Sequence, residues 1–360
     1  MFIIKYLPLC ALYCFTISAF LGINQFFTLL GIFCMLFVVF FRFAKSCSFV
    51  NKYYFPVILM MCVGATLNIF FTTNGLGGVF TLFAVMNLAI SIIENPRLYL
   101  FSSKMILIFL LFLFYYIVLI LQIDPNSIYV GMSRNYVGLL LVAYLLLYCF
   151  LNYVINNKIL TILPVIALPL SVLLVGRTSM IAIFLLCLTI LLCFLKQMNF
   201  IVKLVTLITI IALLVYFDDD ILLLYSASSF GGFGLDTPRY QLWKDFFRQI
   251  DFFTFIFGID TLKIPQLIEY NGNIHNGFLN ILARTGIGFV FFIPILLLSF
   301  FKYFKKSEYF LFILLGLFSI RAFFDTGIFI GNLGFIFYSL MLYPHKYYTI
   351  KRKNILYCNK

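Results

Sequence analysis

Apolar runs long enough to cross a lipid bilayer recur along almost the whole of this sequence, from residue 2 to residue 343. A transmembrane helix needs about 20 apolar residues, and most runs approach that length, with short connections between them. Charged residues make up 10% of the chain, whereas soluble domains contain roughly 25%. The sequence therefore predicts an all-α polytopic membrane protein.

The apolar pattern predicts about twelve transmembrane helices. They cover residues 2–21, 26–41, 54–71, 76–93, 105–123, 136–155, 159–175, 180–195, 200–217, 285–301, 309–320 and 328–343, and the tenth has an alternative start at residue 276. We divide the chain into an N-terminal bundle of about nine helices (1–217), a loop domain (218–275), a C-terminal group of about three helices (276–343) and a basic tail (344–360).

The distribution of charge supports this topology. Lysine and arginine concentrate in the cytoplasmic connections of membrane proteins. With both termini in the cytoplasm, the inner connections hold 17 basic and 2 acidic residues, and the outer ones hold 8 basic and 10 acidic residues. The resulting balances of +15 and −2 account for the net charge of +13. Membrane orientation thus explains the basic charge, and nucleic acid is not expected as a partner.

The basic residues predicted outside also differ in type from those inside. Six of the 8 outer ones are arginines, whereas 14 of the 17 inner ones are lysines. A guanidinium group is a planar fork of donors that suits phosphate and carboxylate. Anchoring of helix ends at the membrane interface is the alternative explanation, and it accounts for about half of these arginines. The outer arginines are Arg134, Arg177, Arg239, Arg248, Arg284 and Arg321.

Residues 218–275 are the one long polar segment, and they predict a periplasmic loop. Pro238 at the first helical position predicts a helix that continues through Arg239. Apolar residues then recur at intervals of three and four, as in an amphipathic helix on a membrane surface. They are Leu242, Trp243, Phe246, Phe247 and Ile250. The carboxylates at 218–220 lack metal-ligand spacing, so we predict no metal site and no cofactor.

His275 is the strongest candidate for a catalytic base. It lies at the predicted outer interface just before an apolar run, and a helix N-terminus favours the neutral imidazole. A neutral imidazole accepts a proton from an attacking hydroxyl group. A structural histidine that caps a helix or stacks at the headgroup level is an equally good interpretation. His345 lies among basic residues near the chain end, where we expect a solvated side chain.

Three arginines have informative surroundings. Arg177 lies between two apolar runs, where a charge at the helix centre costs ~2.5–3.5 kcal/mol, and this predicts a partner. Arg321 precedes Asp325 by four residues, so the two are predicted to pair on one helix face. Arg284 follows His275 by nine residues, which places them on opposite faces of a continuous helix. A break at Thr285–Gly286 would remove that constraint, and the sequence leaves it open.

Several motifs together resemble the bacterial O-antigen polymerase (Wzy-type) and O-antigen ligase superfamily. They are Gly-Arg-Thr at 176–178, Arg239 with Trp243, Phe257-Gly258, His275-Asn276-Gly277-Phe278-Leu279 and Gly286-Ile287-Gly288. The arrangement of many spans around one long outer loop in the C-terminal third resembles this group as well. The His-Asn-x-x-Leu stretch is the most specific of these similarities.

The resemblance implies a glycosyltransferase with a GT-C-like fold in the bacterial inner membrane. It would join undecaprenyl-pyrophosphate-linked oligosaccharide repeat units on the periplasmic face without a metal, with membrane lipids and a chain-length regulator as further partners. By the resemblance, His275 matches the family's loop histidine, and Arg177 and Arg239 match its arginines. The other candidates for binding pyrophosphate or substrate are Arg321, Arg134, Arg284 and Asn276.

Two other functions are compatible with part of this pattern. An O-antigen ligase would make the same transfer to lipid A core, and the modest loop of 57 residues (218–274) favours the polymerase. A flippase or another transporter needs ionisable residues near the membrane midplane, often on broken helices. The charges here lie at the predicted outer helix ends and in one loop, which argues against transport. Asn68 and Asn87 are polar residues inside predicted spans that none of these functions explains.

Overall fold

The computed structural model describes residues 2–45, 55–72, 76–125, 127–129, 134–159, 161–174, 176–196, 239–269, 272–325 and 328–345. This part of the chain is helical and contains no strand. The predicted ninth span (200–217), the carboxylates at 218–220 and most of the basic tail lie outside the described residues.

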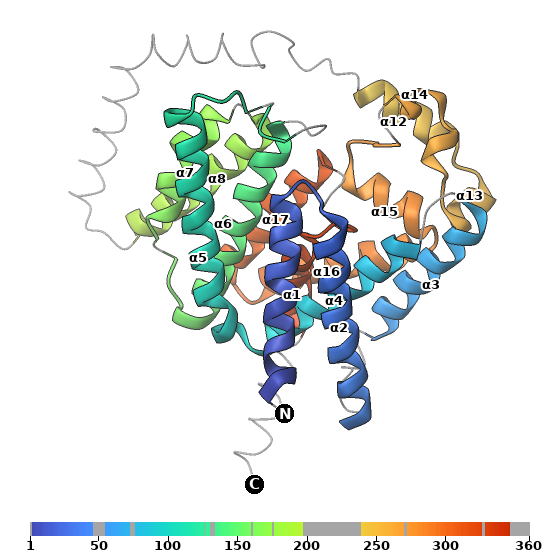
Figure 1. The fold of residues 1–360 in the computed structure, drawn as a ribbon, viewed down its shortest axis with the longest axis horizontal. Coiled ribbons are helices and arrows are strands. Elements are labelled where there is room, and N and C mark those ends of the chain that lie inside the picture. Colours follow the sequence, from blue (N-terminus) through green and yellow to red (C-terminus); the bar gives the residue numbers. More distant parts are fainter. Residues whose placement is uncertain are drawn as a thin grey trace.

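In the part of the chain that the structure describes, long and medium helices form the bundle, and several short helices lie between α8 and α16 (Figure 1). In the first half they are α1 (Phe2–Phe20), α2 (Gln25–Lys45), α3 (Phe55–Phe71), α4 (Leu76–Glu94), α5 (Pro96–Tyr115) with its π-helical extension η2 (Tyr116–Ile120), α6 (Arg134–Asn156), α7 (Leu163–Leu173) and α8 (Arg177–Lys196). The second half contains the shorter helices α12 (Arg239–Arg248), α13 (Phe252–Phe257), η3 (Thr261–Lys263), α14 (Pro265–Ile268) and α15 (Gly277–Thr285). The long helices α16 (Gly288–Lys305) and α17 (Tyr309–Phe323) follow them. A last helix covers residues 334–345.

Five of the described helices are long and apolar enough to cross a membrane. They comprise residues Gly77–Glu94, Pro96–Ile120, Asn135–Asn156, Thr178–Leu195 and Gly288–Lys305. Shorter apolar helices of 10–17 residues accompany them in α1, α2, α3, α7 and α17. The chain therefore has the character of an α-helical membrane protein, and the predicted number of twelve spans stays a prediction.

The structure moves several of the predicted span boundaries. The fifth span begins at Pro96 and not at residue 105, because proline suits the first helical turn and the polar Ser102 and Ser103 do not end the helix. Ser102 Oγ accepts a hydrogen bond from Tyr13 Oη at 3.0 Å, so its polarity is satisfied by α1. The seventh helix is shorter than predicted, and the last one begins at 334, after turns at 328–333.

One end of the bundle gathers the ends of α1 and α17 with the starts of α2, α6 and the last helix. Asn332 Nδ2 donates to Ser18 Oγ at 2.7 Å and to Thr28 Oγ1 at 3.0 Å. Tyr136 Oη donates to the carbonyl of Ala19 at 2.6 Å. Arg321, near the end of α17, donates from Nη2 to the backbone carbonyl of Asn135 at the start of α6, at 2.7 Å. We call this end of the bundle the loop end, because α12–α14 pack there (Figure 1).

The other end gathers the opposite ends of the same helices. Tyr153 Oη, in the last turns of α6, donates to Glu308 Oε2 beside the start of α17 at 2.7 Å. Lys302, near the end of α16, contacts His345 at the end of the last helix. We call this the lysine end. Helices α6 and α17 thus run in opposite directions between the two ends, as the alternating topology predicts.

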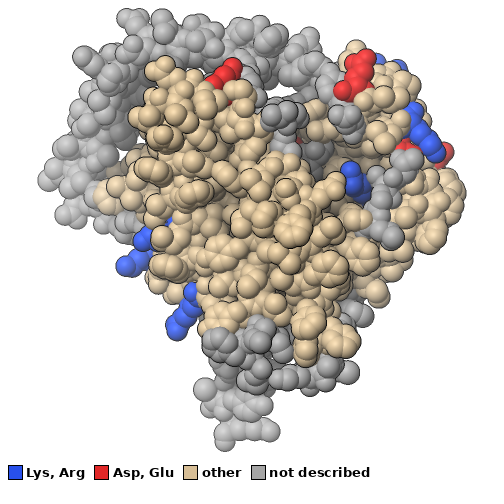
Figure 2. Space-filling view, viewed as in Figure 1, with Lys and Arg blue, Asp and Glu red and all other residues tan. Residues whose placement is uncertain are grey.

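Charged side chains are sparse on the face of the bundle shown in Figure 2, where most of the surface belongs to other residue types. The acidic side chains visible in this view lie along its upper edge and around α12–α14. Large exposed apolar side chains, among them Phe33, Phe40 and Phe112, lie on α2 and α5. Exposed apolar surface of this extent marks a site that contacts a membrane or another protein.

The segment from α12 to α15 has its own small apolar core. Leu242 and Phe246 of α12 are buried in it, so the amphipathic pattern predicted for this helix is confirmed, but its apolar stripe faces protein. Burial of such a side chain stabilises by about 1.5–3 kcal/mol. Phe247 lies on the other side and is exposed. The remaining members of the core are Ile259, Ile264, Leu267, Ile274, Leu279, Leu282 and Ala283.

Helix α3 fastens this segment to the bundle. Asn68 is buried, and its Nδ2 donates to the carbonyls of Phe257 at 2.7 Å and Ala283 at 2.9 Å. Gly64, one turn earlier, lies against the backbone of Thr285, where a Cβ atom would overlap the carbonyl oxygen. Asn68 therefore holds two loop carbonyls. Asn87 instead donates within its own helix, to Phe83.

Candidate functional site

The loop histidine lies directly before α15. Asn276 is buried and caps this helix, since its Oδ1 accepts from the backbone N–H groups of Phe278 at 2.9 Å and Leu279 at 3.1 Å. Ser, Thr, Asp and Asn favour this position because they satisfy the free N–H groups of a first turn. The helix ends at Gly286, whose φ of 49° suits glycine. The break between α15 and α16 therefore exists, and the two helices are separate.

His275 has a positive φ, which is uncommon for residues other than glycine. Its φ is 54°, in the left-handed region that histidine, like asparagine and aspartate, adopts more often than most residues with a Cβ atom. The Oδ1 of Asn273 accepts from the His275 backbone N–H at 2.8 Å and stabilises this turn. The His275 side chain is half-buried. Uncommon conformations of this kind cluster at functional sites because the surrounding structure must maintain them.

The turn that carries His275 packs against the end of α17. A Cβ atom on Gly277 would lie 2.8 Å from the carbonyl oxygens of both Ala322 and Asp325, so only glycine allows this approach. Trp243 of α12 closes the other side, since its Nε1 donates to the carbonyl of Ile274 at 3.0 Å. Its ring also packs edge-on against Phe323, with centroids 5.1 Å apart. Helix α12, the histidine turn and α17 thus meet at the loop end.

Arg321 is the most deeply buried charge at this end. Its side chain is 0% exposed. Its Nη2 donates to Asp325 Oδ2 at 3.0 Å and to the backbone carbonyl of Asn135 at 2.7 Å, so the predicted ion pair is confirmed. Within the described residues, its Nε and Nη1 atoms have no hydrogen-bond partner. A buried donor without a partner costs about 1–3 kcal/mol, and more when it is charged. An ordered water, a bound ion, backbone strain or a catalytic role accounts for such a group in native structures.

The starts of α6 and α8 lie next to each other. A Cβ atom on Gly138 would overlap the side chain of Ser179, and a Cβ atom on Gly176 would lie 3.9 Å from Asn135 Oδ1. Both helices have 20 residues or more. The first N–H groups of a helix and its macrodipole favour an anion at the N-terminus. Arg134 and Arg177 are the first residues of the two helices.

Two further polar groups at this end were not predicted from the sequence. Ser179 Oγ and Tyr129 Oη are buried and have no hydrogen-bond partner within the described residues. Tyr129 packs edge-on against Tyr136, with ring centroids 5.6 Å apart. Ser179 directly follows the Gly-Arg-Thr motif, and this position in the sequence was the feature that could have identified it as a site residue. A search for hydroxyl groups near the arginine-bearing helix starts would have found both.

The other predicted site residues differ in position. Arg239 is the first described residue of α12, the helix that holds Trp243 on the histidine turn. Arg284 lies at the far end of α15, roughly 10 Å along the helix from Gly277 by the rise per residue. Its Nε donates to Asn280 Oδ1 at 3.3 Å, and a Cβ atom on Gly78 of α4 would lie 3.6 Å from its Nη1. Arg284 therefore lies beside α3 and α4, away from Arg321.

The described residues contain no group of three or more His, Cys, Asp and Glu side chains that could hold a metal ion. The polar groups described at the loop end are one buried guanidinium group, which is paired with Asp325, two hydroxyl groups and two helix N-termini. The guanidinium group, the hydroxyl groups and the helix N-termini are hydrogen-bond donors, and donors of this kind suit an oxyanion.

Comparisons with protein-family models, with curated proteins and with solved structures match nothing to this chain.

Proposed function

We propose that this protein is an O-antigen polymerase that joins oligosaccharide repeat units carried on undecaprenyl pyrophosphate, at the periplasmic face of the bacterial inner membrane. The observation that supports this most directly is the fully buried Arg321, with Nε and Nη1 unpaired among the described residues. A guanidinium group donates in a planar fork that suits the oxygens of phosphate or pyrophosphate, as it suits those of a carboxylate.

The donor's pyrophosphate would bind at the loop end, between Arg321 and the starts of α6 and α8. Negative charge builds up on the leaving group as the bond between sugar and phosphate breaks. Fixed donors that point at this charge lower the barrier, because they need no rearrangement during the reaction. Arg134 and Arg177 enter the proposal as the first residues of helices whose N-termini face the same region.

His275 would serve as the general base. The acceptor hydroxyl oxygen attacks the anomeric carbon, its proton passes to the imidazole, and the carbon–oxygen bond to pyrophosphate breaks. Undecaprenyl pyrophosphate leaves with the bonding electron pair. The Asn273 hydrogen bond and the packing of Gly277 on α17 hold the histidine turn next to the end of α17, and precise placement of this kind supplies much of enzymatic catalysis.

The experiment that tests this function uses the purified full-length protein in detergent or nanodiscs, with one lipid-linked repeat unit as the sole substrate. Products are separated by length. Polymer of increasing length supports the polymerase. Transfer that requires added lipid A core would assign the ligase function instead. Intact substrate under both conditions, with folded protein, would refute glycosyl transfer.

A further inference from the structure

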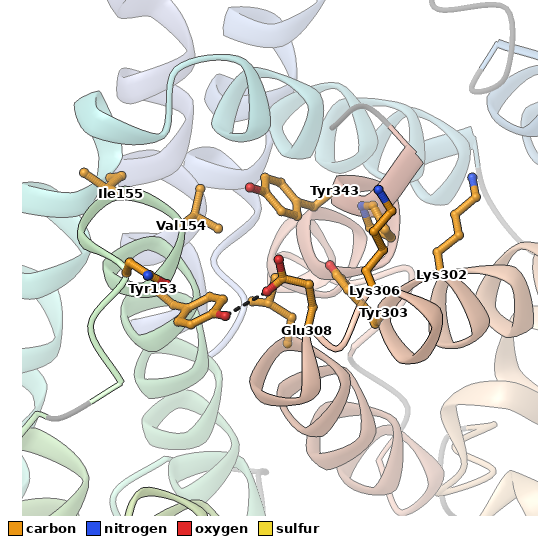
Figure 3. Close-up of a pocket in the computed structure, with 11 residues that line it drawn as sticks. Tyr153, Val154, Ile155, Lys302, Tyr303, Lys306, Glu308 and Tyr343 are labelled. Atoms are coloured by element: carbon orange, nitrogen blue, oxygen red, sulfur yellow. Dashed lines mark hydrogen bonds between the residues drawn. The ribbon is translucent and has the colours of Figure 1, made fainter. Parts of the chain in front are cut away.

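A second polar cavity lies at the lysine end, away from the site proposed above. It has a volume of about 310 Å³ and opens between the ends of α6 and α16, the start of α17 and the last helix. Tyr153, Lys302, Lys306, Glu308 and Tyr343 contribute its polar lining (Figure 3). Nothing in the proposed transferase chemistry uses these residues.

The lysines and the carboxylate are held on different sides of this cavity. Figure 3 shows the side chains of Lys302 and Lys306 extending in the same direction, and Tyr153 hydrogen-bonded to Glu308. The Tyr153 hydroxyl donates to Glu308 Oε2 at 2.7 Å, which fixes the carboxylate against α6. Two ammonium groups and one carboxylate give the lining a formal charge of +1. An occupant with one negative charge therefore balances it.

A chain of buried hydrogen bonds positions Lys302. Its ammonium group is a donor only, so His345 Nδ1 accepts from it at 2.6 Å, and Nε2 then donates to Ser299 Oγ at 2.9 Å. Ser299 Oγ in turn donates to the carbonyl of Met341 at 2.7 Å. His345 is buried, so the expectation that it is solvated was wrong. The reason is that α16 and the last helix pack together around it.

The place of the cavity indicates what enters it. Lys302 lies three residues before the end of a helix that is long and apolar enough to span a membrane, so the cavity opens where the apolar surface ends. Val154, Ile155 and Leu311 line its apolar side. An occupant with a charged head and an apolar tail fits this combination. Basic pockets between transmembrane helices at the cytoplasmic face suit lipid headgroups.

We propose that this cavity binds the headgroup of an anionic phospholipid of the surrounding bilayer, of the phosphatidylglycerol type. Its phosphodiester, with one negative charge, lies between Lys302 and Lys306. The hydroxyl groups of the headgroup face Glu308, which accepts hydrogen bonds from them, and the acyl chains follow the apolar side. The site is separate from the loop end, so it stands or falls independently of the transferase function.

The test is native mass spectrometry of the full-length protein in detergent, titrated with phosphatidylglycerol, with phosphatidylcholine or with glycerol 3-phosphate. Preferential binding of phosphatidylglycerol is expected. Each lysine near an anionic lipid contributes about 1 kcal/mol, or roughly five-fold in affinity. K302Q/K306Q should therefore lose about 25-fold, and K306Q alone, at an exposed position, about five-fold.

Lys305 supplies the matched control. It lies on the same helix, its ammonium group sits 5.9 Å from the centre of the Phe301 ring, and it is not among the residues that line the cavity. K305Q should bind phosphatidylglycerol like the unchanged protein. Equal loss in K305Q and K306Q, or no preference over phosphatidylcholine, would overturn the proposal. Binding of glycerol 3-phosphate with the same affinity as the lipid would overturn it too, and would assign the cavity to a soluble phosphate.

Discussion

Arg321 Nη2 donates to the backbone carbonyl of Asn135 at 2.7 Å, across 186 residues of sequence. This bond joins the last turn of α17 to the first turn of α6, where the carbonyl of a helix start is close to the N-terminal end of the macrodipole. Asp325 forms an ion pair with the same guanidinium group, and its Oδ2 lies 3.0 Å from Nη2. The same residue thus links two helices and offers two donors at the loop end that no other described residue pairs with.

Replacement of Arg321 by lysine separates the structural role of this residue, as a link between helices, from its proposed role in binding pyrophosphate. Lysine keeps the charge and its attraction to Asp325, but it lacks the planar fork. We expect polymer formation to fall by about 100-fold, as for loss of one donor to a developing anion. Arg321→Met removes the ion pair with Asp325 and should destabilise the protein by about 3–5 kcal/mol.

Thermal unfolding and the length distribution of the product measure the two effects. Arg248→Lys is the matched control, because Arg248 is exposed and pairs with Asp245 at 3.1 Å on α12. Arg248→Lys should change neither the unfolding temperature nor the length distribution of the product. Activity of Arg321→Lys at the level of this control would remove Arg321 from the binding of pyrophosphate and leave it as a structural link.

His275→Asn tests the general base without disturbing the turn. Asparagine tolerates the left-handed backbone conformation better than most residues, so the φ of 54° remains accessible. The variant should insert and fold, yet cells should produce lipopolysaccharide with at most one repeat unit. Loss of general base catalysis lowers rates by about 10²–10⁴-fold.

His275→Ala should have the same effect on chain growth, with a small additional loss of stability. Gel ladders of lipopolysaccharide measure the chain length, and membrane fractions measure the amount of inserted protein. Long ladders of normal length from His275→Asn would exclude the imidazole from the mechanism.

Arg177→Lys tests the first residue of α8. The positive charge stays, but the bidentate geometry is lost, so we expect a strong fall in polymer length and amount. Arg97→Lys in the first turn of α5 is the control, since Arg97 lies at the predicted cytoplasmic side. Ladders close to those of the unchanged protein would assign Arg177 to anchoring at the membrane interface.

Asn68→Leu should loosen the segment from α12 to α15. The carbonyl of Phe257 would lose the Asn68 donor, whereas the carbonyl of Ala283 keeps the backbone N–H of Ile259 at 2.9 Å. A buried carbonyl without a partner costs about 1–3 kcal/mol. Faster proteolysis of the loop and a lower melting temperature are expected. Thr66→Val is the control, because Thr66 is exposed and its hydroxyl donates within its own helix, to Cys62 at 2.7 Å. Equal stability of the two variants would contradict the role assigned to Asn68.

The sequence predicted those features that depend on neighbours within a few residues. The apolar runs indicated helices in a membrane, because their length and composition are local properties. Arg321 and Asp325 were predicted to pair because a helix places them one turn apart. The stripe of Leu242 and Phe246 was predicted from its spacing, although the partner of that stripe was not. Predicted roles for Arg134, Arg177 and Arg239 depend on a substrate and stay predictions.

The tertiary structure decided where these local elements meet. Asn68 was an unexplained polar residue until Phe257 and Ala283, 189 and 215 residues away, supplied its acceptors. His345 was expected in solvent and is buried beside Lys302 and Ser299. Contacts across such separations leave no periodic trace in the sequence, because packing between helices selects them. Sequence alone thus determined that the chain forms helices suited to lipid, and the packing of those helices gathered the buried donors at one end.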